Sequence, residues 1–116
     1  MRDEIAKYLQ DVLDACGRLQ AFAGNRTFAD YQADEMLRAA VERKFIIVGE
    51  ALREAQKLDR PALASLPNLK EIIGFRNILV HGYADIEDTI VWGALENHVP
   101  VLIREVQALL ATADPV

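Results

Sequence analysis

The sequence predicts an all-α protein, an antiparallel bundle of four to five helices formed by a single domain over residues 1–116. Good helix formers are plentiful, whereas only six glycines and four prolines interrupt the 116 residues. Apolar residues recur every three or four positions, which is the spacing of one helix face. Turn-forming residues separate these periodic segments at short intervals, and the length is near that of a typical single domain.

The first two helices are predicted over the N-terminal half of the chain. The apolar pattern of the first runs from Ile5, and Gly24, followed by Asn25, ends it. The second runs to about Lys57 from Thr27, a suitable N-cap with Asp30 three residues later. The apolar positions of the first helix share one face: Ile5, Tyr8, Leu9, Val12, Leu13, Cys16, Leu19 and Phe22.

The middle of the second helix, residues 45–52, is apolar almost all round. Such a segment has to be buried on two sides, either at the centre of the bundle or against a second subunit. A monomer that exposed residues 45–48 would carry an apolar patch that is unusual in a soluble chain. The sequence therefore predicts a homodimer that buries apolar surface of the second and fourth helices.

A third helix follows a predicted loop over residues 58–67, which contains two prolines. It is predicted to begin just after Asn68, because Asn68 and Glu71 have the spacing of a capping box. It is predicted to stop at about His81, because Gly82 suits the position just beyond a helix end.

A fourth helix is predicted after Asp85, which can cap its N-terminus. Pro100 removes an amide donor from the following segment. Residues 101–111 therefore form either a kinked continuation of the fourth helix or a separate fifth helix.

The composition narrows the classes of function. The net charge of −5 argues against a general nucleic-acid-coating protein but allows a small, locally basic cleft. No apolar run is long enough to span a membrane, and the charged N-terminus does not resemble a signal peptide. One cysteine excludes an internal disulfide framework. These features predict a cytoplasmic protein without a membrane partner.

The residues 73–83 carry most of the chemical information in the chain. Arg76, Asn77, His81 and Tyr83 lie within eight residues of an otherwise apolar segment. Arginine is a permanent cation whose planar fork fits phosphate oxygens. The imidazole of histidine suits proton transfer near neutral pH. This combination indicates chemistry on a phosphodiester, with Arg76, His81 and Asn77 as the candidate catalytic residues.

The spacing of these residues limits how they can act together. Asn77 and His81 are four apart and share a helix face, whereas Arg76 and His81 are roughly 140° apart on an ideal helix. Arg76 and His81 converge only if the helix end loosens or if a second chain contributes. Metal-free RNA cleavage needs a base, an acid and a cation, and a two-fold dimer would supply two copies of His81.

Structural roles remain open for the same residues. Arg76 suits an ion pair with Glu50 or Glu71 as well as it suits catalysis. His81, beside a helix-ending glycine, can serve as a partner of the helix dipole. Glu50 lies in an apolar stretch where an unpaired carboxylate would be costly, so a partner such as Arg76 or Arg43 is expected. We interpret Glu50 as a residue that orients the site.

Other conspicuous residues are assigned structural roles. Cys16 and Met36 are predicted to lie in the core, and Trp92 to serve packing or an interface. His98 and Glu96 lack the Glu-x-x-His spacing of a di-iron bundle, and no second such motif exists. The sequence therefore predicts neither a metal site nor a cofactor.

The chain resembles the HEPN superfamily, and most closely its HepT-like branch, over nearly its whole length. Arg-Asn-x3-His-x-Tyr over residues 76–83 is similar to the active motif of that family. Residues 40–51, 69–83 and 90–92 are similar to the segments on either side. The resemblance implies a dimeric, metal-independent ribonuclease toxin with Arg76 and His81 as its catalytic pair and RNA as its substrate.

The resemblance also implies a partner and a modification. Members of the branch are usually encoded beside an MntA-like nucleotidyltransferase antitoxin, in a type VII-like toxin–antitoxin pair. That enzyme transfers AMP to the motif tyrosine, here Tyr83, and so blocks the cleft. The added phosphodiester would neutralise charge and fill space beside Arg76.

Two classes of function remain from the sequence. As an enzyme, the chain cuts RNA through Arg76 and His81. As a non-catalytic binding module, it is a helical dimer that docks a nucleotidyltransferase or a nucleotide. The acidic balance favours the binding module slightly, and the intact motif favours the enzyme.

Overall fold

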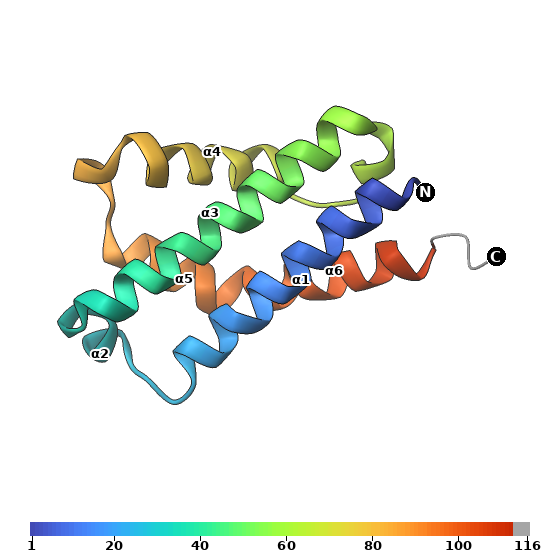
Figure 1. Ribbon diagram of the computed structural model, residues 1–116. Helices are drawn as coiled ribbons and strands as arrows, with labels where there is room; N and C mark the ends of the chain where they lie inside the picture. Colours follow the sequence, from blue (N-terminus) through green and yellow to red (C-terminus); the bar gives the residue numbers. More distant parts are fainter. Residues whose placement is uncertain (113–116) are drawn as a thin grey trace.

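The computed structural model describes residues 1–112, with Tyr83 described for its backbone alone. These residues form helices and no strand, which confirms the all-α prediction (Figure 1). The α-helices are α1 (Asp3–Ala23), α2 (Phe28–Ala33), α3 (Glu35–Leu58), α4 (Leu69–His81), α5 (Asp88–Asn97) and α6 (Val99–Ala111). Two short 3₁₀ helices are η1 (Pro61–Leu63) and η2 (Tyr83–Asp85).

Helix α3 lies at the centre of the arrangement. It runs antiparallel to α1 on one side, and α4 returns along its other side (Figure 1). Helix α6 packs on α1 and α5, while α2 packs on α3 and α5. Because α3 is covered from two sides, the prediction that residues 45–52 are buried on two sides is confirmed within a single chain.

The core is a single cluster of apolar side chains, and no polar or charged residue of the described part is buried in it. Cys16 is fully buried, and Trp92 packs against Tyr31 with ring centroids 5.1 Å apart, so both assignments to packing are confirmed. The assignment of Met36 to the core is wrong, because its side chain is 81% exposed. Met36 lies in the first turn of α3 and is not among the residues that this helix buries.

The second predicted helix is interrupted at Asp34, which divides it into α2 and α3. Thr27 begins α2 with a capping box, as predicted, because its hydroxyl accepts from the Asp30 amide and Asp30 accepts from the Thr27 amide. At Asp34 the backbone is extended, and the carboxylate accepts a hydrogen bond of 3.0 Å from the Leu37 amide. Aspartate competes in this way for backbone amides, so a new helix starts there.

Two predicted N-caps are not formed. Asn68 precedes α4 in the left-handed conformation (φ 59°), and its side chain makes no capping hydrogen bond. Asp85 lies in η2 and donates its amide to the Gly82 carbonyl, while α5 begins later, at Asp88. The chain enters α4 through a turn and enters α5 from extended backbone at Glu87, and the side-chain spacing reveals neither.

The C-terminal ends of α1 and α4 lie where the sequence predicts them. Helix α1 stops at Ala23, and Gly24 follows with a φ of 45°, a value that favours glycine. Helix α4 stops at His81 as predicted, although Gly82 has a φ of −111°. Pro100 lies in the first turn of a separate helix, α6, which decides between the two alternatives. None of the described helices combines the length and apolarity needed to cross a membrane.

Candidate functional site

Helix α4 brings the predicted catalytic residues to one side of an open groove of about 620 Å³. We call it the motif groove, and its lining residues are Arg53, Arg76, Asn77, Ile78, His81 and Gly82. Five of them lie on α4 or at its end, and Arg53 comes from α3. The structure thus gathers Arg76, Asn77 and His81 at one surface.

Arg76 reaches this surface by passing closely over α3. A Cβ atom added at Gly49 would lie 2.8 Å from Cγ of Arg76 and still closer to its Cβ. Real Cβ atoms do not approach so closely, so the crossing of α3 and α4 requires glycine at this position. The Arg76 side chain is only 14% exposed as a result.

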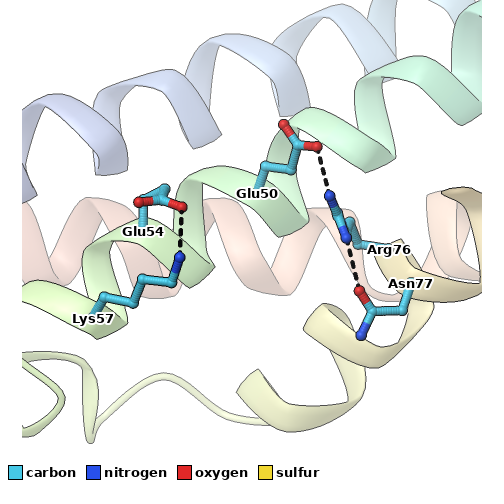
Figure 2. A network of polar contacts seen from close by, with 5 residues as sticks. All are labelled: Glu50, Glu54, Lys57, Arg76 and Asn77. Atoms are coloured by element: carbon cyan, nitrogen blue, oxygen red, sulfur yellow. Dashed lines mark hydrogen bonds and ion pairs between the residues drawn. The ribbon is translucent and has the colours of Figure 1, made fainter.

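The guanidinium of Arg76 is held at two points (Figure 2). Its Nη2 donates to Oε1 of Glu50 at 2.9 Å, and its Nη1 donates to Oδ1 of Asn77 at 2.9 Å. The pairing of Arg76 with Glu50 confirms one of the contacts expected from the sequence. Glu50 is nevertheless not buried, although it lies in an apolar stretch, because its side chain is 47% exposed.

The third nitrogen of this guanidinium, Nε of Arg76, is buried and has no hydrogen-bond partner among the described residues. The two outer nitrogens therefore carry all the contacts that fix the plane of the fork. An oriented fork next to an open groove suits a bidentate contact with a phosphate.

His81 closes α4 and is exposed at the edge of the motif groove. Of the two conditions named for convergence of Arg76 and His81, loosening of the helix end is not observed. The Gly82 amide donates to the Ile78 carbonyl at 2.8 Å, as in a regular helix. Arg76 and His81 nevertheless line the same groove, with Asn77 on the face that His81 shares.

Tyr83 follows Gly82 directly and opens η2. Its side chain lies outside the described part of the structure, so the predicted modification site is located by its backbone only. Gly82 lines the motif groove, and this places the Tyr83 backbone next to the groove's edge.

Sequence reasoning missed Arg53, which lies three residues after Glu50 on α3. Residues three apart share a helix face, so a partner of Arg76 at position 50 could have directed attention to position 53. The contact between α3 and α4 that brings Arg53 into the groove is tertiary, and no local pattern encodes it.

Groups with perturbed pKa values lie away from the motif groove. Burial raises the pKa of the Cys16 thiol to about 12, which keeps it protonated and unreactive at neutral pH. Burial, and then the charge of Asp88, raise the pKa of Glu42; burial also raises that of Tyr31. Among residues 1–112, no three side chains of His, Cys, Asp or Glu lie close enough together to hold a metal ion.

A second, smaller groove of about 280 Å³ adjoins the motif groove and shares Ile78 with it. Its apolar residues include Phe75, Ile86 and Ile90. Ile78 is 48% exposed and Ile90 is 57% exposed. The site therefore has a charged face on one side of α4 and an apolar face on the other.

Comparisons with known proteins agree with this description. Residues 12–109 match the family described as Ribonuclease HepT-like. A candidate RNase of Methanocaldococcus jannaschii is 30% identical over 90% of this chain and 94% of its own length. A candidate RNase of Caldanaerobacter subterraneus is 31% identical over 89% of this chain and 91% of its own length.

A candidate ribonuclease HepT of Thermococcus cleftensis is 25% identical over 82% of this chain and 86% of its own length. No solved structure matches the chain significantly. The family match spans most of the chain and includes the whole of α4 and the motif groove. The chain therefore belongs to the HepT-like ribonuclease family.

Proposed function

We propose that this protein is a metal-independent endoribonuclease that cuts RNA in the motif groove. The observation that carries the proposal is the presence of Arg76 and His81, with Asn77, along one open groove on α4. Membership of the HepT-like family and the names of the relatives support the same activity. The cation is supplied by Arg76, so the reaction needs no metal ion.

The reaction transfers the phosphate within the RNA strand. A base removes the proton of a 2′-hydroxyl, whose oxygen attacks phosphorus. The bond from phosphorus to the 5′-oxygen breaks, and an acid protonates that oxygen. The products are a 2′,3′-cyclic phosphate and a 5′-hydroxyl. Arg76 stabilises the charge that accumulates on the phosphorane oxygens, and Glu50 and Asn77 hold its fork in position.

A homodimer supplies the two proton-transfer groups that this reaction uses. Each chain has one histidine in the motif groove, and a two-fold axis beside α4 brings a second copy of His81 to a shared cleft. One copy acts as base and the other as acid. Exposed Ile78, Val80 and Ile90 provide apolar surface for this contact.

The surface that supports the dimer differs from the one expected from the sequence. Phe45 and Val48 are 8% and 2% exposed within one chain, because α1 and α4 cover α3. The reasoning that a monomer would expose them is therefore wrong. Met36 on α3 is exposed as well, but the exposed apolar surface next to the motif sequence lies on α4 and α5, the second of which is the fourth helix of the sequence prediction.

Regulation is proposed to come from an MntA-like nucleotidyltransferase antitoxin, as part of a type VII-like toxin–antitoxin pair. AMP transferred to Tyr83 would attach beside Gly82, which lines the motif groove. Its phosphate would offset the charge of Arg76, and its base and sugar would occupy the space that RNA needs.

The alternative is a non-catalytic module that docks the nucleotidyltransferase. The net charge of −5 and the pairing of Arg76 with Glu50 favour it, because both weaken attraction for RNA. In this case the motif groove holds a nucleotide or the modified tyrosine without cutting RNA.

The ribonuclease and the docking module can be distinguished by incubating the purified protein with total RNA, with and without EDTA. We expect discrete RNA fragments ending in cyclic phosphate in both reactions, and intact RNA with the His81→Ala variant. Intact RNA with the wild-type protein would favour the docking module. Cleavage that EDTA abolishes would exclude the metal-independent mechanism.

A further inference from the structure

The charged side chains around the motif groove are unevenly paired. Glu50, Arg53, Glu54 and Lys57 fall at intervals of three and four on α3, so they share one face of that helix. Glu50 is bonded to Arg76 at 2.9 Å, and Glu54 is bonded to Lys57 at 3.1 Å (Figure 2). These are the two ion pairs found among the described residues, and neither includes Arg53.

This pairing makes Arg53 the source of the local positive charge. The two ion pairs balance Glu50 against Arg76 and Glu54 against Lys57. Arg53 is the remaining charge of the set, is exposed, and lines the motif groove opposite α4. An acidic protein with a net charge of −5 repels RNA as a whole, so an uncompensated cation at the groove has a large influence on binding there.

We propose that Arg53 binds a phosphate of the RNA strand next to the phosphate at Arg76 and His81, and so sets the path of the strand through the motif groove. This inference rests on the proposed function. A guanidinium free of protein acceptors can offer its whole donor fork to phosphate oxygens. The long side chain of Arg53 lines the motif groove and can adjust its position to that of the RNA phosphate.

The two arginines of the groove therefore have different roles. Arg76 is fixed by Glu50 and Asn77 and is mostly buried, which suits a group that must meet charge developing in the transition state. Within the described part of the chain Arg53 has no such support, and it contributes equally to binding of the substrate and of the transition state. Loss of Arg53 should raise KM with little change in kcat, whereas loss of Arg76 should lower kcat.

A binding experiment tests this independently of cleavage. The probe is a fluorescein-labelled, fully 2′-O-methylated single-stranded RNA, which has no free 2′-hydroxyl and cannot be cut. Its affinity for the wild-type protein and for Arg53→Ala is measured by fluorescence anisotropy over a series of salt concentrations. We expect Arg53→Ala to bind about tenfold more weakly at low salt. The slope of log affinity against log salt should become shallower by ~0.7, the value for one lost phosphate contact on a single strand.

The matched control is Arg104→Ala, which removes the same charge from an exposed position on α6, away from the groove. It should leave the slope unchanged, and Arg53→Lys should restore most of the lost affinity. If Arg53→Ala behaves like Arg104→Ala, or if the wild-type protein does not bind the probe at low salt, the role of Arg53 is refuted. Failure of the proposed function is seen separately, as wild-type protein that binds the probe but leaves unmodified RNA intact.

Discussion

Helices α1 and α4 both pack on α3, yet they are held in place in different ways. Helix α1 buries six side chains, from Ile5 to Leu19, and contacts α3, α6 and α5. Helix α4 buries Leu79 alone, and its main contact is with α3. Two large apolar residues of α4, Ile78 and Val80, remain exposed. One helix is thus fixed by the core, and the other presents its side chains to the groove.

The contrast explains why the two helices carry different kinds of residue. Every third or fourth position of α1 is apolar because these positions meet the core. On α4 the positions that meet α3 include Arg76 and Phe75, whose ring lies 5.3 Å from that of Phe45 in an edge contact. Substitutions on α1 should therefore affect stability, and substitutions on α4 should affect activity.

The largest expected effect is on activity, from His81→Ala. This side chain is exposed at the end of α4, so its loss leaves the fold unchanged. If His81 acts as acid or base, RNA cleavage should fall by roughly 10²–10⁴-fold. Arg76→Ala should cause a loss of the same order, because it removes the cation proposed to stabilise the phosphorane. The rates are measured on total RNA, and thermal unfolding followed by circular dichroism serves as the control.

Wild-type cleavage in His81→Ala would remove His81 from the mechanism. A thermal unfolding midpoint of His81→Ala far below that of the wild type would mean that this end of α4 is part of the stabilising core. In that case the contrast between α1 and α4 would not hold.

The opposite result is expected for Leu9→Ala on α1. Leu9 is fully buried, and removing such a side chain costs about 2–5 kcal/mol of unfolding free energy. The matched change on α4 is Ile78→Ala, measured at protein concentrations where the chain is monomeric, because Ile78 belongs to the proposed dimer surface. Its side chain is 48% exposed within one chain, so the change should cost less than about 1 kcal/mol. Urea unfolding of the two variants measures both values. Equal losses would contradict the proposed division between the two helices.

These two helices also show what sequence could predict. The limits of α1 and α4 were predictable because periodic apolar residues and nearby glycines mark them locally. Arg76, Asn77 and His81 were predictable as candidates because all three lie on one helix. Their roughly 140° separation did not predict that a single chain would bring Arg76 and His81 to the same groove. Arg53 lines the groove, and Phe45 is buried, only because α3 and α4 pack together. Contacts between helices of this kind have no local signal in one sequence.

An intermediate effect is expected at the crossing of α3 and α4, from Gly49→Ala. The new methyl group would overlap the Arg76 side chain, so α4 has to shift, at a cost of about 1–3 kcal/mol. The higher helix propensity of alanine offsets up to about 1 kcal/mol of this cost. Cleavage should fall by at least about tenfold, because small displacements of catalytic groups are costly.

Gly17→Ala on α1 is the control, since a Cβ atom there meets nothing within 4 Å beyond its chain neighbours and the backbone of its own helix. It should stabilise the protein by about 0.5–1 kcal/mol and leave cleavage unchanged. If Gly49→Ala also gained stability and kept its activity, the close approach of Arg76 to α3 would not be needed for the site.

The smallest effect on cleavage itself is expected from Tyr83→Phe, just beyond α4. A phenol has an ordinary pKa near ~10 and is a poor base at neutral pH, so cleavage should stay within about threefold of the wild type. Incubation with the partner nucleotidyltransferase, ATP and Mg²⁺ should silence the wild-type protein and add the mass of AMP to the peptide that contains Tyr83. The Tyr83→Phe variant should stay active and unlabelled under the same conditions.

Tyr8→Phe, a change in α1 remote from the motif, is the matched control and should be silenced like the wild type. AMP on another residue, or a Tyr83→Phe variant that the partner's activity still silences, would show that the end of α4 is not the point of regulation.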